Sequence, residues 1–166
     1  LGTFGMLRFL IPIFKLSSYY FSPFVYLISL LSMVYASFTT LRQIDLKKII
    51  AYSSIIHMNY LIIGLFSFNI EGILGSIILM VAHGFVSGGL FVCVGILYDR
   101  YHIRLLKSYG GLNLYMPLFS IFFLLFTLAN ISFPGSFNFL GEFFVLLGIF
   151  RQNISFAILI MFVMII

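Results

Sequence analysis

The sequence is poor in charge and in cysteine, and each shortage excludes a class of protein. Charged residues make up 8% of the 166 residues, whereas a soluble domain carries about 25%. The chain is therefore predicted to be an integral membrane protein without a separate soluble domain. Its single cysteine, Cys93, excludes an internal disulfide, an iron–sulfur cluster and a cysteine-rich zinc site within this chain. Because its neighbours are apolar and small, Cys93 is expected to be a buried packing residue.

The net charge of +5 does not indicate nucleic-acid binding, because the basic residues lie in short loops between apolar runs. With one helix per apolar segment, two basic loops fall on the same side of the membrane, and the joints on the other side carry only Lys15 and Arg151. The positive-inside rule predicts that the more basic side faces the cytoplasm or the mitochondrial matrix. The residues of the two basic loops are Arg42, Lys47, Lys48, Arg100, Arg104 and Lys107.

Hydrophobic segments separated by short polar joints run along the whole chain, so a single all-α membrane domain is expected over residues 1–166. We interpret the first segment as the end of a helix and the last as the start of one. Neither end has the pattern of a signal peptide, and the chain is expected to be a piece of a longer protein or the product of a divided gene. The segments lie at about 1–14, 23–41, 46–68, 72–98, 116–150 and 154–166.

Three residues are expected to mark helix starts. Asp45 suits the N-cap position of the third segment, because its side chain can accept hydrogen bonds from free backbone amides. Pro23 and Pro117 suit first helical turns, where the missing N–H of proline costs nothing.

The segment 116–150 is too long for one span and is interrupted by "SFPGSFN". Pro134 removes a backbone donor and Gly135 permits a tight bend, so a helix broken into two halves is predicted. A broken backbone at membrane depth is tolerated only where protein or water satisfies its free polar groups. Discontinuous helices of this kind mark ion sites in transporters. The expected hydrogen-bond partners, which could also hold water, are Asn130, Ser132 and Asn138.

Three ionisable residues lie deep inside apolar segments: His57, His83 and Glu142. His57 follows Asp45 by 12 residues, which places it roughly 18 Å along a helix and near mid-membrane. Ionisable groups inside a membrane are costly and commonly functional. The alternatives are that the histidines are hydrogen-bonded packing residues, or that Glu142 reaches the interface from a helix end. The roughly 13 Å of helix between Glu142 and Arg151 argues against the latter.

The chemistry of these groups favours proton transfer. Imidazole and carboxyl groups exchange protons with each other and with water, so a chain of them can carry protons across a membrane. Two histidines and a glutamate could also bind a metal, but no HExxH or similar spacing is present. No metal site is therefore expected.

Four stretches of the sequence resemble, in order, landmarks of the chain 4 subunits of respiratory complex I, NADH–ubiquinone oxidoreductase. They are "LRQIDLKKIIAYSSIIHM", "LMVAHGFVSGGLF", "GILYDRYHIRLLKSYGGL" and "FPGSFNFLGEFFVLLGIF". The resemblance is collinear over nearly the whole chain and is strongest to mitochondrial versions from plants, algae and protists. The same superfamily contains subunits of bacterial cation/proton antiporters.

The resemblance implies the antiporter-like fold, a polytopic helix bundle with one broken helix, in the mitochondrial inner membrane. His57, His83 and Glu142 match family positions on a proton-conducting axis. Most of the family's first repeat, with its glutamate and lysines, would lie before Leu1. Other membrane-arm subunits, and a chain or segment that supplies the missing half, are therefore expected as partners. The chain itself is expected to hold no cofactor, and FMN, iron–sulfur clusters and ubiquinone are expected in other subunits.

Three functions follow from these observations. The first is a proton-translocating subunit of complex I, in which quinone reduction elsewhere drives charge changes at Glu142, His83 and His57. The second is a subunit of a multichain cation/proton antiporter, which shares the helices without the redox arm. The third is a structural membrane piece with an inert axis.

Overall fold

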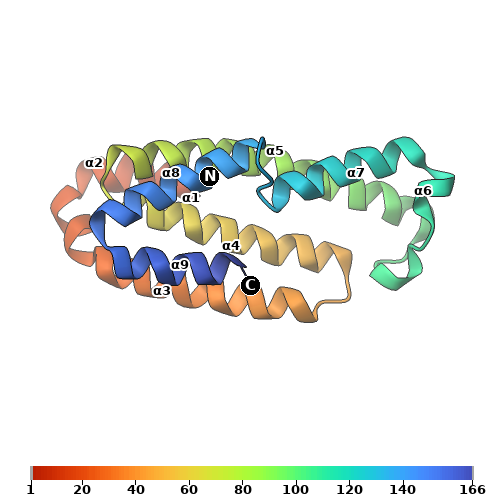
Figure 1. The fold of residues 1–166 in the computed structure, drawn as a ribbon, viewed down its shortest axis with the longest axis horizontal. Coiled ribbons are helices and arrows are strands. Elements are labelled where there is room, and N and C mark those ends of the chain that lie inside the picture. The colour runs from red at the N-terminus through yellow and green to blue at the C-terminus, as the bar shows by residue number, and fades with distance from the viewer. Residues whose placement is uncertain (1, 166) are drawn as a thin grey trace.

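The computed structural model describes residues 2–165 as an elongated bundle of helices (Figure 1). No strand occurs within that range, and a lone antiparallel bridge joins Asp45 to Leu105. Three helices, α3, α4 and α5, are long and apolar enough to cross a membrane. The elements are α1 (Gly2–Gly5), the π-helix η1 (Met6–Leu10), α2 (Ile11–Ile13), α3 (Lys15–Arg42), α4 (Leu46–Phe66), α5 (Ile70–Tyr101), the 3-10 helix η2 (Leu106–Ser108), α6 (Leu112–Tyr115), α7 (Pro117–Asn130), α8 (Phe137–Gln152) and α9 (Ile154–Ile165).

The prediction that Pro23 begins a helix was wrong, because α3 starts at Lys15 and contains Pro23 in its interior. A proline inside a helix leaves the carbonyl four residues earlier without its usual donor. Here that carbonyl belongs to Tyr19, and the hydroxyl of Ser22 donates to it at 2.9 Å. The expected polar joint at residues 15–20 is therefore the first part of α3, and the chain turns just before it, at Phe14.

The other two expected helix starts lie where predicted. Pro117 is in the first turn of α7. Asp45 occupies the N-cap position of α4, although its side chain caps no backbone amide. One carboxylate oxygen of Asp45 instead lies 3.5 Å from Nζ of Lys48.

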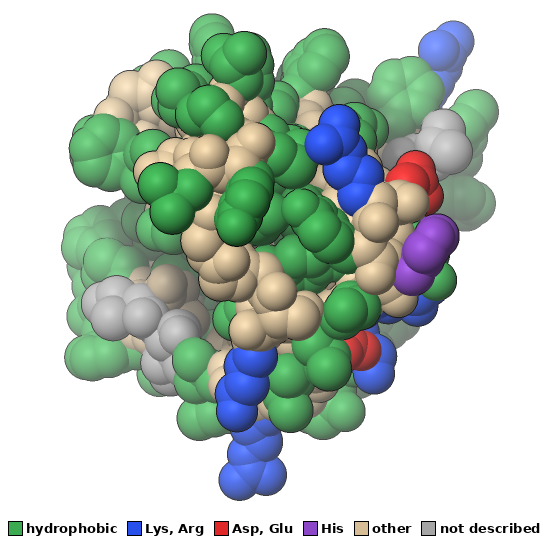
Figure 2. Space-filling model, turned by 90° about the vertical axis from the view of Figure 1, so that its right-hand side faces the viewer, with side chains coloured by type: hydrophobic (Ala, Val, Ile, Leu, Met, Phe, Trp, Pro, Cys, Tyr) green, Lys and Arg blue, Asp and Glu red, His purple; other side chains and the backbone are tan. Residues whose placement is uncertain are grey.

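The two basic loops meet at one end of the bundle, as their positions in the sequence predict. The amide of Leu46 donates to the carbonyl of Arg104 at 3.1 Å, and the amide of Leu106 donates to that of Ile44 at 3.0 Å. Figure 2 looks at this end and shows basic side chains projecting among hydrophobic ones. Arg151 lies at the opposite end of the bundle, where it pairs with Glu71.

A row of glycines joins α8 to α5, the helix against which it packs most extensively. We call Gly72, Gly75, Gly141 and Gly148 the glycine seam. A methyl group on Gly75 would lie 2.6 Å from the backbone nitrogen of Val145, and one on Gly141 would lie 2.9 Å from the backbone of Leu79. Small residues permit such close approach of helices in membranes, where packing replaces the hydrophobic drive. The seam therefore fixes the position of α8.

The predicted break in the fifth segment is present between α7 and α8. Each half has fewer than the roughly 20 residues that a span requires: α7 has 14 residues and α8 has 16. Pro134 and Gly135 lie in the turn between them, and Gly135 has a φ of +102°, a conformation that favours glycine. Cys93 is buried, as expected for a packing residue.

Candidate functional site

The site begins at the C-terminus of α7, where the chain leaves the helix in a Schellman motif. The amide of Phe133 donates to the carbonyl of Leu128 at 3.1 Å, and the amide of Ser132 donates to that of Ala129 at 3.2 Å. Ser132 occupies the left-handed position of the motif, with a φ of +58°. Glycine is the usual residue there, and any other residue costs about 1–2 kcal/mol of backbone strain.

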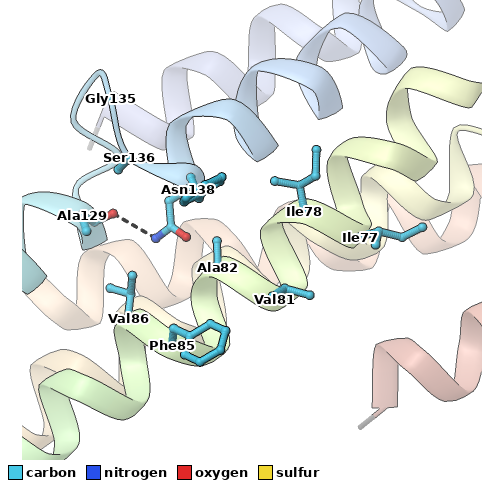
Figure 3. Close-up of a pocket in the computed structure, with 11 residues that line it drawn as sticks. Ile77, Ile78, Val81, Ala82, Phe85, Val86, Ala129, Gly135, Ser136 and Asn138 are labelled. Atoms are coloured by element: carbon cyan, nitrogen blue, oxygen red, sulfur yellow. Dashed lines mark hydrogen bonds between the residues drawn. The ribbon is translucent and has the colours of Figure 1, made fainter.

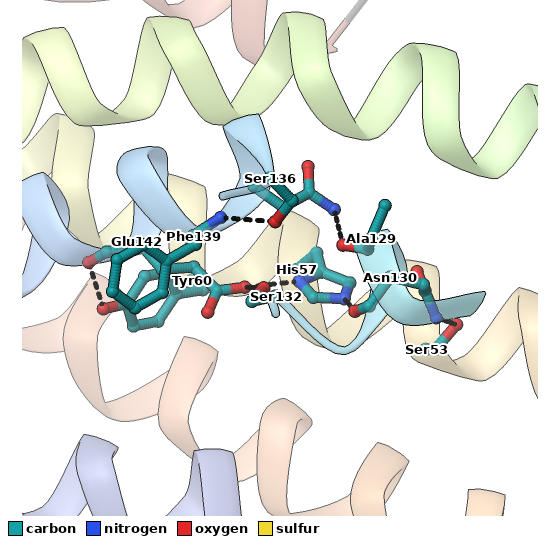
Figure 4. Close-up of polar contacts among 10 residues, drawn as sticks. Ser53, His57, Tyr60, Ala129, Asn130, Ser132, Ser136, Phe139 and Glu142 are labelled. Carbon is teal, nitrogen blue, oxygen red and sulfur yellow. Dashed lines mark hydrogen bonds and ion pairs between the residues drawn. The ribbon is translucent and has the colours of Figure 1, made fainter. Parts of the chain in front are cut away.

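Side chains from two other helices bind the last carbonyls of α7 (Figure 4). Nδ2 of Asn138, on α8, donates to the carbonyl of Ala129 at 2.9 Å. Nε2 of His57, on α4, lies 3.1 Å from the carbonyl oxygen of Asn130. The carbonyls at a helix end have no partner within the helix, so these contacts explain how a helix can stop inside the bundle.

Glu142 projects from the second turn of α8 back towards the same place. Its Oε1 accepts a hydrogen bond from the hydroxyl of Ser132 at 2.5 Å. The same oxygen lies 3.1 Å from Nδ1 of His57, close enough for an ion pair although not aligned as a hydrogen bond. The backbone carbonyl of Glu142 accepts a hydrogen bond from the hydroxyl of Tyr60, on α4, at 2.9 Å. The carboxylate is thus held between the break and α4.

The contacts of His57 define where its protons lie. A carbonyl oxygen can only accept a hydrogen bond, so Nε2 must carry the hydrogen that it donates to Asn130. The other ring nitrogen and the carboxyl group of Glu142 can then hold zero, one or two further protons between them. With one, the pair is either an imidazolium beside a carboxylate or a neutral imidazole beside a carboxyl group. The geometry therefore allows protons to be held at either member of the pair.

His83 extends the site onto α5. Its ring centroid lies 5.1 Å from that of His57. The side chain is 2% exposed, and its Nδ1 has no hydrogen-bond partner among the described residues. A buried polar atom of this kind is costly unless water or another group reaches it. The structure therefore brings His57, His83 and Glu142, the three residues predicted from the sequence, into one cluster.

An apolar groove of 660 Å³ lies between α5 and the turn that joins α7 to α8 (Figure 3). Val81, Ala82 and Val86 line it together with residues of the turn. Asn138 also borders the groove; its side chain is completely buried, and its Oδ1 has no hydrogen-bond partner in the described part of the chain. The groove offers apolar contact surface, and none of His57, His83 and Glu142 lines it.

Two residues of this site, Tyr60 and Ser53, were not predicted from the sequence. Ser53 accepts a 3.3 Å hydrogen bond from Nδ2 of Asn130. Both lie on α4 within four residues of His57, and side chains three and four residues apart share one face of a helix. This spacing from His57 is the feature of the sequence that could have identified both residues. Asn130, Ser132 and Asn138, predicted as hydrogen-bond partners, all form such bonds.

No group of three His, Cys, Asp or Glu side chains is arranged to hold a metal ion anywhere within residues 2–165.

Comparisons with known proteins agree with this architecture. NADH-ubiquinone oxidoreductase chain 4 of Marchantia polymorpha is 59% identical over 153 residues, which cover 92% of this chain and 31% of that protein. NADH-quinone oxidoreductase subunit M of Rhodobacter capsulatus is 46% identical over the same share of this chain and 30% of its own length. The chain thus spans less than a third of the length of these two relatives.

A solved structure of respiratory complex I from Thermus thermophilus with bound NADH contains a chain of the same fold. The two superpose with a TM-score of 0.93 and 31% sequence identity, over 99% of this chain and 35% of that one. The family model described as NADH:quinone oxidoreductase/Mrp antiporter, transmembrane, matches residues 1–166. The chain therefore belongs to the NADH:quinone oxidoreductase/Mrp antiporter family of membrane proteins.

Proposed function

We propose that this chain is part of a proton-translocating membrane-arm subunit of NADH:ubiquinone oxidoreductase in the mitochondrial inner membrane. The observation that carries the proposal is the cluster of His83, His57 and Glu142 beside a broken helix. The relatives with the names quoted above support complex I as the host enzyme. The redox groups, FMN, iron–sulfur clusters and ubiquinone, would lie in other subunits, as would any segment that completes the proton path.

In the proposed mechanism, a proton that reaches the pair of His57 and Glu142 changes how many protons the pair holds. A charge that appears on a neighbouring subunit during quinone reduction shifts the balance between these states, because charges interact strongly where water is excluded. His83 stands next to His57 as the adjoining proton carrier. Glu142 releases the proton on the side of the break.

A cation/proton antiporter subunit is the second candidate, because the matching family model covers Mrp antiporters as well. The cluster itself would serve either function, since both require a carboxyl group that alternates between a charged and a neutral state. The host assembly distinguishes the two. Peptides of this chain in a native-gel band that oxidises NADH support complex I, whereas their presence only in a smaller assembly without that activity supports the antiporter.

The test of the proton function is Glu142→Gln, which keeps the size and polarity of the side chain and removes its exchangeable carboxyl proton. We expect membrane vesicles with the assembled complex to keep most of their NADH oxidation and to lose most proton translocation per NADH. Glu71→Gln is the matched control, because Glu71 is a carboxylate at the far end of the bundle, paired with Arg151. Unchanged proton translocation in Glu142→Gln would favour an inert, structural role.

A further inference from the structure

Ser132 occupies a backbone position that favours glycine, although glycine is used elsewhere in the same turn. Its φ of +58° lies in the left-handed region, at the position of the Schellman motif where glycine is commonest. Three residues later the chain again takes a positive φ, and there the residue is Gly135. A serine that only closed the turn would have no advantage over glycine at residue 132.

The hydroxyl of Ser132 supplies that advantage. It donates a 2.5 Å hydrogen bond to Oε1 of Glu142, ten residues further along the chain. Within the part of the chain that the structure describes, no other side-chain donor is hydrogen-bonded to this carboxylate, since Nδ1 of His57 is near it but not aligned. From this left-handed position at the end of α7, the side chain of Ser132 reaches Glu142 on α8 (Figure 4).

We propose that Ser132 is a positioning residue, which holds the carboxyl group of Glu142 within proton-transfer distance of Nδ1 of His57. This inference rests on the proposed proton function. Oε1 is 2.5 Å from the serine hydroxyl and 3.1 Å from the imidazole nitrogen. Without the hydroxyl, rotation of the flexible glutamate side chain carries the carboxyl group away from His57 and interrupts the path.

The test compares Ser132→Gly with Ser132→Ala in membrane vesicles that contain the assembled complex. Both variants remove the hydroxyl, but their backbone effects are opposite, because glycine relieves the left-handed conformation and alanine keeps its strain. We expect proton translocation per NADH to fall about tenfold in both, which corresponds to about 1.4 kcal/mol. Assembly should be at least normal in Ser132→Gly, which keeps the test valid if Ser132→Ala assembles poorly.

An infrared difference spectrum supplies a readout that a merely structural role would not change. The carbonyl band of the protonated Glu142 side chain is identified by its loss in Glu142→Gln, and it should shift in frequency in both serine variants. Full proton translocation with an unshifted band in Ser132→Gly overturns the positioning role, whatever Ser132→Ala does. If Glu142→Gln itself translocates protons normally, the proposed function fails instead, so the two failures are distinct.

Discussion

Two regions of α8 hold the same helix in opposite ways. The glycine seam, on the side of α5, allows backbone to touch backbone and leaves no space for a methyl group. On the side of α4 and the break lies the polar hub, formed by His57, His83, Asn130, Ser132, Asn138 and Glu142. Its contacts are hydrogen bonds, the 3.1 Å approach of Glu142 to Nδ1 of His57, and the packing of the His83 ring against that of His57. The seam permits one arrangement of the helices, whereas the hub contains the ionisable groups to which we assign the proposed proton transfer.

The difference suits the proposed function, in which the charge of the hub changes while the helices keep their arrangement. Helices in lipid gain little from hydrophobic burial, so packing of small residues and polar contacts must hold them together. If polar contacts alone held α8, each change of protonation would also change the stability of the bundle. With α8 fixed by the seam, the proton exchange proposed for the hub would not have to move the helix.

The largest expected effect comes from filling the seam. In Gly141→Ala the new methyl group would lie 2.8 Å from Cβ and 2.9 Å from the backbone of Leu79, and such overpacking costs about 3 kcal/mol. We expect a marked loss of assembled complex on native gels. Gly84→Ala, on α5, the helix that α8 packs against, is the control, because no heavy atom lies within 4 Å of its added carbon. Equal assembly of the two variants would contradict the role given to the seam.

A smaller loss of stability is expected when the hub loses the hydrogen bond that joins α8 to the end of α7 across the break. Asn138→Ala removes the hydrogen bond to the carbonyl of Ala129 from a fully buried site, at a cost of about 2 kcal/mol. Asn69→Ala is the comparison, because it removes a similar 2.8 Å bond, to the carbonyl of Gly148, near the end of the seam. Asn69 is only half-buried, so we expect the melting temperature of the complex to fall less.

Substitution of His57 separates its two contacts. His57→Gln retains a side-chain amide that can donate to Asn130 but cannot take up a proton, so assembly should persist. Proton translocation per NADH should fall about tenfold, equivalent to about 1.4 kcal/mol. His57→Ala removes both contacts and should also destabilise the complex by about 1–3 kcal/mol, because it leaves buried groups without partners. Normal proton translocation in His57→Gln would mean that His57 only binds the last carbonyl of α7 and carries no proton.

The smallest effect is expected at the far end of the seam. Arg151 pairs with Glu71, but 70% of its side chain is exposed, and exposed ion pairs contribute about 0–1 kcal/mol. Arg151→Gln should therefore leave assembly and proton translocation near normal at physiological salt. Thermal unfolding and vesicle assays provide the measurement. A loss as large as that of Asn138→Ala would mean that the seam depends on charge as well as on packing.

Much of the fold could be predicted from the sequence, because hydrocarbon leaves a chain few choices. A backbone in lipid must bond to itself, so long apolar runs specify helices, and basic loops specify which ends lie together. The same logic exposed the break, since Pro134 and Gly135 interrupt a run with few polar residues. It failed at Pro23, because the hydroxyl of Ser22 satisfies the carbonyl that the proline leaves free, and such local compensation has no clear pattern in a sequence.

The sequence by itself determined that this chain spans a membrane, that one helix is broken, and that two histidines and a glutamate lie inside long apolar segments. Only the tertiary structure decided that Glu142 meets His57 and Ser132 at one oxygen, and that glycines hold α8 in place. The reason is physical. Burial and helix formation depend on residue types along the chain, whereas proton transfer depends on distances of about 3 Å between side chains, which are set when separate helices pack.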